Sequence, residues 1–256
     1  MLRAAARRRT AEGKICMVID LHCHILSGID DGALDLDDSV GMGRVAASDG
    51  IEVVCATPHI RHDHDVRIPE LADRVAEVND ALRDRGVPVE VVPGGEVAET
   101  ALDGLDEPEL RAVSLGGGGW ILLEPRPGPI GDSLIDAADR LRRAGFGVLV
   151  AHPERHAAAD IADRLRDLIE LGALVQVTAA YLVEGPAREP MLALARQGMI
   201  HVVASDAHSS HGGRPLRLSE GIASLGEVDR IAPHLDWVSR EAPAAILRGE
   251  RPAPPY

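Results

Sequence analysis

The chain has 256 residues, 45% of them hydrophobic and only 2% aromatic, with a formal net charge of −14 from 41 acidic and 27 basic side chains. This charge disfavours a broad basic surface for nucleic acid, and few aromatic residues remain for stacking on single-stranded bases. We expect one core built from Val, Leu, Ile and Ala, in a chain of ordinary size for an α/β barrel.

The N-terminal residues 1–16 are rich in Ala and Arg and lack the apolar stretch of a signal peptide. We expect a disordered arm there, or an over-extended start with Met17 as the natural first residue. No apolar run reaches membrane-spanning length, and Cys16, Cys23 and Cys55 lack the spacing of a disulfide framework or a thiolate zinc site. These features predict a cytoplasmic protein without membrane insertion, and they leave its oligomeric state unknown.

Short apolar runs recur along the chain, and continuous runs of Val, Ile and Leu are typical of strands buried on both faces. In chain order the predicted strands are VIDLHCH (18–24), IEVVCATPH (51–59), VEVVPGGE (89–96), WILLEP (120–125), FGVLVAHP (146–153), LVQVTA (174–179) and HVVASDAH (201–208).

Segments of helical period alternate with these strands. Residues 71–86, 132–145, 161–172 and 190–198 place apolar side chains at helical spacing, and each segment ends at glycine. About seven strands in this order, with no G-x-G-x-x-G after a strand, favour a closed or nearly closed β/α barrel over an open doubly wound sheet. We expect one domain over residues 17–250, with GGGG (116–119) as a loop and RPAPPY (251–256) as a tail.

Nearly every predicted strand ends in His, Glu or Asp, and in a β/α barrel the carboxyl ends of the strands meet at one face. Because side chains alternate along a strand, His22 and His24 face one way and Cys23 the other, and Asp206 and His208 form a similar pair. Buried charges at independent strand ends are costly unless paired or metal-bound, and imidazole and carboxylate ligands suit Mn, Fe or Zn. The remaining strand-end residues are His59, Glu96, Glu124 and His152.

The motifs DLHCHIL, DDG, TPH, GGEV, LLEP, AHPERH and SDAH follow the order and spacing of the PHP (polymerase and histidinol phosphatase) superfamily, which the chain resembles over roughly residues 17–217. Within it, the chain most resembles the bacterial CpsB/CapC/YwqE-type protein-tyrosine phosphatases of capsule and exopolysaccharide synthesis. The resemblance implies a distorted β/α (TIM-like) PHP barrel, dependence on Mn²⁺ with up to three ions, and the phosphotyrosine-containing tail of a bacterial tyrosine kinase as the partner.

The resemblance also implies a role for individual residues. One ion would be held by His22, His24, Glu96 and Asp206, a second by Glu96, Glu124 and His152, and a third by Asp31, His59 and His208. Arg155 and Arg214 would clamp the phosphate, although Arg214 lies one residue further from SDAH than is usual. The alternatives are a surface position for Arg214 and a loop-bracing pair of Arg155 with Glu154 or Asp160.

Two nearby segments are assigned less prominent roles. Asp30 is expected to be a turn residue rather than a partner that orients a ligand. Arg61, His62 and His64 are expected in a solvated loop rather than at the entrance of the site.

Metal-activated water would make a protein nucleophile unnecessary in phosphate ester hydrolysis. One rival hypothesis is a cysteine phosphatase, because Cys55 and Arg61 have Cys-x5-Arg spacing, but the intervening residues contain no glycine for a phosphate cradle. A second is a small phosphoester substrate, such as histidinol phosphate, in the same metal site. A third is a non-catalytic, metal-bound binding module.

Overall fold

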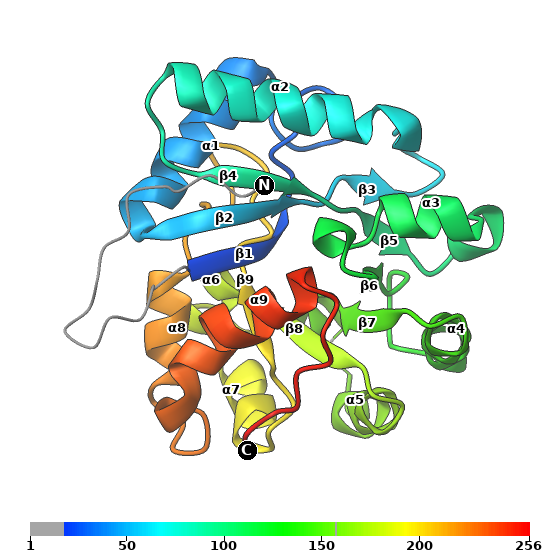
Figure 1. Ribbon diagram of the computed structural model, residues 1–256. Coiled ribbons are helices and arrows are strands. Elements are labelled where there is room, and N and C mark those ends of the chain that lie inside the picture. Colours follow the sequence, from blue (N-terminus) through cyan, green and yellow to red (C-terminus); the bar gives the residue numbers. More distant parts are fainter. Residues whose placement is uncertain (1–17, 157) are drawn as a thin grey trace.

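The computed structural model of the chain describes residues 18–156 and 158–256 (Figure 1). The predicted arm and the alternative start at Met17 therefore lie outside the described residues. Within these residues the strands are β1 (Val18–Cys23), β2 (Ile51–Ala56), β3 (His59–Ile60), β4 (Glu90–Pro93), β5 (Glu96–Ala98), β6 (Trp120–Glu124), β7 (Gly147–Val150), β8 (Leu174–Thr178) and β9 (Val202–Ala204).

All the predicted strand runs are present, but two of them divide. Residues 51–59 form β2 and β3 because Pro58 has no N–H to continue the ladder. Residues 89–96 form β4 and reach β5 through Gly94 and Gly95, where a Cβ atom would lie 2.7 Å from Cys55 Sγ and 2.9 Å from Ile60 Cγ1, respectively. Glycine is required there because the chain passes too close to the neighbouring strands for a side chain.

The strands form two parallel sheets, ordered β1-β2-β4 and β3-β5-β6-β7-β8-β9. The two breaks carry the chain from the first sheet into the second. After β9, a parallel bridge joins Cys23 to Ala207, and the N–H groups of Asp206 and His24 donate to His22 O and Ala207 O, each at 2.8 Å. The first and last strands thus meet at their carboxyl ends, as a distorted β/α barrel requires.

The helices lie outside the strands (Figure 1). The four predicted helical segments form α2, α4, α5 and α7, but α1 and several short helices were not predicted. The helices are α1 (Leu36–Asp49), α2 (Leu71–Asp84), α3 (Glu107–Ala112), α4 (Asp132–Arg143), α5 (Ile161–Glu170), α6 (Ala179–Val183), α7 (Arg188–Arg196), α8 (Ser219–Leu225) and α9 (Ala242–Leu247), the last preceded by a π-helical turn (Trp237–Glu241).

Local helix propensity does not predict α1, because Gly41 and Gly43 interrupt its apolar pattern. Its ends are nevertheless well specified, since Asp35 caps the first turn and Gly50 ends the helix with φ 85°. The two glycines permit close packing, because a Cβ on Gly43 would lie 2.4 Å from Leu82 Cδ2 of α2. Tertiary packing therefore determines this helix more than local propensity does.

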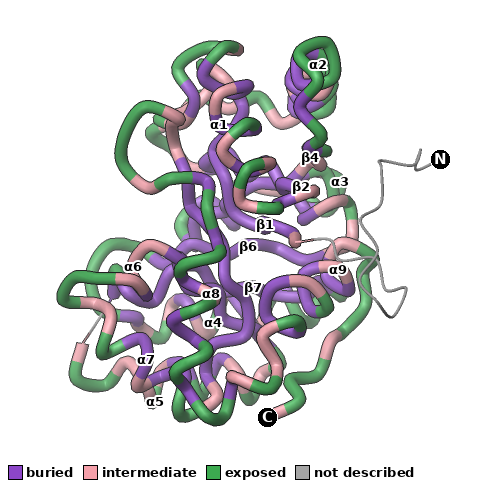
Figure 2. Tube along the Cα trace, turned by 90° about the vertical axis from the view of Figure 1, so that its left-hand side faces the viewer, coloured by how far each residue is buried: buried purple, intermediate pink, exposed green. Residues whose placement is uncertain are grey.

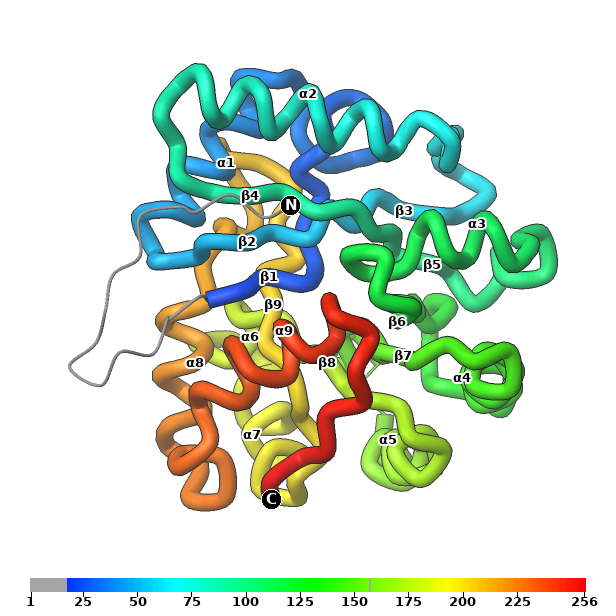
Figure 3. The backbone as a smooth tube through the Cα atoms, viewed as in Figure 1, coloured from blue at the N-terminus to red at the C-terminus, as the bar shows by residue number. Residues whose placement is uncertain are grey.

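The strands and the inner faces of the helices are buried, and exposure concentrates on the outer helix faces and loops (Figure 2). The C-terminal residues have no regular structure and run from α9 towards α7 (Figure 3). They are packed rather than free: the hydroxyl of Tyr256 donates to Ile200 O at 2.6 Å, and its ring meets Trp237 edge-on. Among residues 18–156 and 158–256, no helix combines the length and apolar character needed to cross a membrane.

Candidate active site

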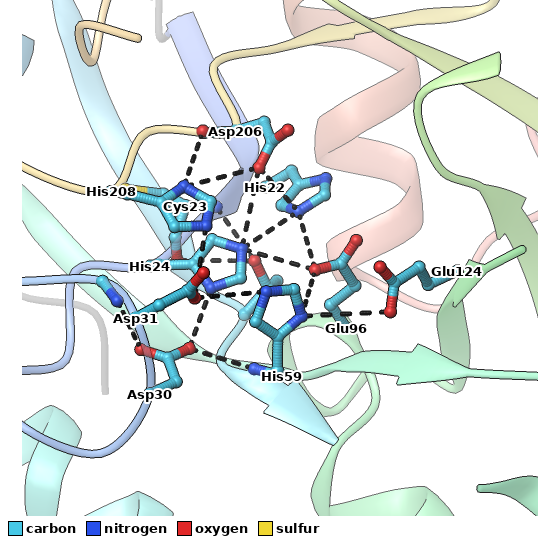
Figure 4. Close-up of polar contacts among 12 residues, drawn as sticks. His22, Cys23, His24, Asp30, Asp31, His59, Glu96, Glu124, Asp206 and His208 are labelled. Carbon is cyan, nitrogen blue, oxygen red and sulfur yellow. Dashed lines mark hydrogen bonds and ion pairs between the residues drawn. The ribbon is translucent and has the colours of Figure 1, made fainter. Parts of the chain in front are cut away.

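All nine predicted metal ligands lie in one cluster at the carboxyl ends of the strands. Figure 4 labels eight of them; His152, which follows β7, is the ninth. His22, His59, Glu96 and Glu124 lie on strands, and the other residues lie directly after β1, β7 and β9 or in the loop that follows β1. His152 and Asp206 have φ values of 32° and 51°, which is unusual for residues other than glycine and typical of functional sites.

The ligand atoms form four groups within which all atoms lie within 4.8 Å of one another. His22, His24 and Glu96 form one group, as expected. Asp31, His59 and His208 form a second, as expected, and His24 belongs to this group too. Glu124 groups with Glu96, as expected, and also with His59. His152 groups with His22 and Asp206, and its Nε2 also lies 2.7 Å from Oε1 of Glu96, its expected neighbour.

His22 and His24 face each other, with their Nε2 atoms 3.3 Å apart. His22 Nδ1 lies 3.0 Å from Gln176 Oε1, and His24 Nδ1 lies 2.8 Å from the Asp30 carboxylate. Both partners accept hydrogen bonds, so each Nδ1 carries a proton, and each Nε2 has a lone pair when its ring is neutral. Burial opposes protonation, yet the hydrogen bond to the Asp30 carboxylate and the neighbouring Glu96 carboxylate raise the pKa of His24 to about 10, so without a cation this ring takes a second proton at Nε2. The site therefore favours a positive charge beside these rings, which either a second proton on His24 or a bound cation would supply.

Glu96 and Glu124 provide carboxylates that also fit bound cations. Glu96 Oε2 lies 3.4 Å from both His22 Nε2 and His24 Nε2 and 2.9 Å from His59 Nδ1. Among the residues that the structure describes, the Oε2 atoms of Glu96 and Glu124 have no hydrogen-bond partner. Burial and the charge of Glu96 raise the pKa of Glu124 to about 7. A metal ion would satisfy these oxygens and relieve the repulsion between the two carboxylates.

Both predicted phosphate-binding arginines lie beside the cluster. Arg155 donates from its guanidinium to Asp206 Oδ2, and its side chain is 32% exposed. Arg214 donates from Nε to Asp206 O at 2.8 Å and approaches Asp206 Oδ1 at 3.2 Å. The longer spacing before Arg214 therefore does not remove it from the site. Arg155 pairs with Asp206, and Glu154 instead accepts from the Thr178 N–H at 3.0 Å.

The expectation that Asp30 serves mainly as a turn residue is wrong. One of its oxygens accepts from the Gly32 N–H at 3.0 Å and so makes the turn, but the other is shared by His24 Nδ1 and the His59 N–H. Burial would raise the pKa of Asp30, but the hydrogen bond from His24 lowers it to about 2. Asp30 is thus an ionised partner that orients a candidate ligand.

The segment after His59 is also closer to the site than expected. Arg61 NH1 lies 3.2 Å from Glu124 Oε1, and the His64 ring stacks on His59 with centroids 5.0 Å apart. His62 remains exposed. Gln176 was missed altogether, although a polar residue in the middle of the apolar run LVQVT is the signal that identifies it.

Cys23 and Cys55 are both buried, as expected for cysteines that pack in the core and do not act as nucleophiles. Cys23 is buried, with its Sγ 3.7 Å from Ala207 O. Cys55 is buried in β2 and donates to Pro93 O at 3.3 Å. Burial raises the pKa of the Cys55 thiol to about 12, so its thiolate is disfavoured. This environment is the opposite of what a cysteine phosphatase needs.

Comparison with known proteins gives consistent matches. The family model described as capsular polysaccharide synthesis, CpsB/CapC, matches residues 18–230. The tyrosine-protein phosphatase YwqE of Bacillus subtilis (strain 168) is 32% identical over 200 residues, which cover 75% of this chain and 78% of YwqE. The putative tyrosine-protein phosphatase CapC of Staphylococcus aureus is 26% identical over 210 residues, covering 79% of this chain and 81% of CapC.

A solved structure gives the same result in three dimensions. It comes from work on YwqE from Bacillus subtilis and CpsB from Streptococcus pneumoniae, described as unique metal-dependent tyrosine phosphatases. It superposes with a TM-score of 0.78 at 28% identity, covering 91% of this chain and 95% of that one. A TatD-family hydrolase from Entamoeba histolytica, at 10% identity and a TM-score of 0.54, shares the fold alone. The chain belongs to the CpsB/CapC family of capsular polysaccharide synthesis.

Proposed function

We propose that this protein is a metal-dependent phosphatase that hydrolyses phosphotyrosine on proteins. The observation that carries the proposal is the close approach of the Nε2 atoms of His22 and His24, which face each other beside Glu96 in a cluster flanked by two arginines. Family relatives named as tyrosine phosphatases support it.

The proposed ligands are the nine clustered residues, and up to three ions are proposed, with Mn²⁺ favoured over Fe and Zn. Bound ions would acidify a water molecule and neutralise charge on the phosphoryl group. Gln176 fixes the tautomer of His22, and Asp30 fixes that of His24. The proposed ligands are His22, His24, Asp31, His59, Glu96, Glu124, His152, Asp206 and His208.

Arg155 and Arg214 are proposed to bind the phosphoryl oxygens. Both guanidinium groups contact Asp206 and remain partly exposed, at 32% and 25%. The planar fork of arginine matches two phosphoryl oxygens at once. A tyrosyl phenolate has a pKa of about 10 and leaves more readily than an alkoxide, so a dedicated general acid is not required. Phosphotyrosine is therefore the substrate chemistry that this site serves best.

The phosphotyrosine-containing tail of a bacterial tyrosine kinase is the proposed partner. A small phosphoester such as histidinol phosphate is the second candidate, because these ligands act on phosphate rather than on the group that carries it. A metal-bound binding module is disfavoured, since it would not require two arginines at the cluster.

The test compares turnover of a phosphotyrosine peptide with turnover of histidinol phosphate, with metal content measured on the same preparation. We expect a higher kcat/KM for the peptide. A clear preference for histidinol phosphate would overturn the proposed substrate class, and hydrolysis of neither by metal-loaded protein would overturn the enzymatic proposal.

A further inference from the structure

Asp38, in the first turn of α1, connects two loops at the rim of the site. Its side chain is 3% exposed. Its Oδ1 atom accepts from the Ser210 N–H at 2.8 Å and from the Ser210 hydroxyl at 2.6 Å, while its Oδ2 atom accepts from the Leu34 N–H at 3.1 Å. One buried carboxylate thus joins the loop after β1 to the loop after β9.

These two loops carry the most exposed of the proposed metal ligands. Asp31 lies in the first loop with a side chain that is 56% exposed, and His208 lies in the second with one that is 20% exposed. Asp31 Oδ1 lies 3.5 Å from His208 Nε2. Neither residue belongs to a strand, so their separation depends on how the loops are held. The second loop also carries Arg214.

Helix capping alone does not account for Asp38. The first turn of α1 is capped by Asp35, which accepts from the Asp38 N–H at 2.9 Å. The bond to Leu34 resembles a cap, but the bonds to Ser210 lie outside the helix. A Cβ on Gly41 would lie 2.5 Å from Ser210 Oγ, so α1 and the second loop are packed closely at this point.

We propose that Asp38 is a positioning residue that sets the distance between Asp31 and His208 and the placement of Arg214. It thereby controls the affinity of the ion site formed by His24, Asp31, His59 and His208. The inference rests on the proposed metal-dependent phosphatase function. The strand-borne ligands of the other groups do not depend on Asp38.

The experiment compares Asp38→Ala, Asp38→Asn and Asp49→Ala in the full chain. Asp49 is a matched control at the other end of α1, because its carboxylate accepts from the Leu218 and Ser219 N–H groups at 2.7 and 3.0 Å but contacts neither Leu34 nor Ser210. Mn²⁺ binding is titrated by calorimetry on metal-free protein, and kcat and KM are measured with a phosphotyrosine peptide at limiting and saturating Mn²⁺.

We expect Asp38→Ala to weaken one class of Mn²⁺ site by roughly 10- to 100-fold, as is common when a residue that orients a ligand is removed. KM should rise because Arg214 is displaced, and excess Mn²⁺ should restore kcat in part. Asp38→Asn keeps one acceptor oxygen and should be intermediate. Asp49→Ala should bind Mn²⁺ as the wild type does.

Unchanged Mn²⁺ affinity in both Asp38 variants, or an equal loss in Asp49→Ala, would overturn the positioning role. If Asp38→Ala does not fold, Asp38→Asn and Ser210→Ala decide by the same titration, and wild-type affinity in both would again contradict the inference. The proposed function fails separately, through a wild type that hydrolyses no phosphotyrosine peptide.

Discussion

His22 Nε2 and His24 Nε2 lie 3.3 Å apart, and this arrangement is held from outside by Gln176 and Asp30. In two neutral rings with protons on Nδ1, the facing Nε2 lone pairs would repel unless a positive charge, a proton or a metal ion, lay between them. Gln176 and Asp30 therefore belong to the proposed metal site, because they fix the tautomers of the two histidines.

The first prediction concerns Asp30. Asp30→Asn removes the carboxylate that accepts from His24 Nδ1, so the ring loses its preferred tautomer. We expect metal affinity to fall by roughly 10- to 100-fold, as measured by titration of metal-free protein with Mn²⁺. The fold should survive, because the amide oxygen can still accept from a backbone N–H. Wild-type metal affinity in this variant would show that Asp30 only makes the turn.

The second prediction concerns Arg155. Arg155→Ala removes a charge-assisted contact to the phosphoryl oxygens, worth about 2–4 kcal/mol, or roughly a 30- to 1000-fold loss of kcat/KM. Arg155→Lys should fall between Ala and the native residue because it restores the charge but not the fork.

Because Arg155 contacts Asp206, the metal content and melting temperature of each variant must also be measured. A loss confined to stability or metal content, with unchanged kcat/KM per metal-loaded molecule, would contradict the phosphate-binding role.

A third prediction separates the metal mechanism from a cysteine mechanism. The pKa of the buried Cys55 thiol is raised to about 12, so Cys55→Ser should keep most activity and the native thiol should resist alkylation near neutral pH. A loss of more than about a thousandfold in kcat, in folded and metal-loaded Cys55→Ser, would revive the cysteine mechanism.

The fourth prediction concerns acid stability at the amino end of β9. Burial lowers the pKa of His201 from 6.5 to about 4, and its Nδ1 accepts from the Val175 N–H at 3.0 Å. Between these values the unfolded chain binds a proton that the folded chain does not, so His201 reduces stability as the pH falls from 6.5 to 4.

The measurement is the free energy of unfolding of the wild type and of His201→Gln at several pH values. We expect the wild type to be the more stable form at pH 7, by about 1–3 kcal/mol, because the variant disturbs the acceptor of a buried N–H. The difference should narrow as the pH falls to 4. A difference that is constant with pH would show that His201 does not protonate on unfolding.

The strand runs and eight of the nine clustered residues could be predicted from the sequence because each of the eight lies in or directly after an apolar run, whereas Asp31 lies in a loop and was expected only from the resemblance of the DDG motif. The division of residues 89–96 could not, since it depends on how closely Gly94 and Gly95 approach Cys55 and Ile60. Helix α1 was missed for a similar reason, because its glycines contact Ser210 and Leu82 across the fold.

The supporting contacts of the site were harder to predict than the ligand candidates. Asp30 has the sequence signature of a turn residue, and only the folded chain shows its contact with His24. Arg61 approaches Glu124 from a segment rich in charged side chains, which on its own indicates a solvated loop. The grouping of Glu124 and His152 likewise depends on side-chain directions that strand order does not specify.

The most direct test of the metal-dependent mechanism is to strip the wild-type protein of metal, verify the metal content, and measure hydrolysis of a phosphotyrosine peptide before and after Mn²⁺ is restored. The clustered imidazoles and carboxylates predict that activity disappears with the metal and returns with Mn²⁺. Undiminished activity in protein verified to be metal-free would contradict the mechanism.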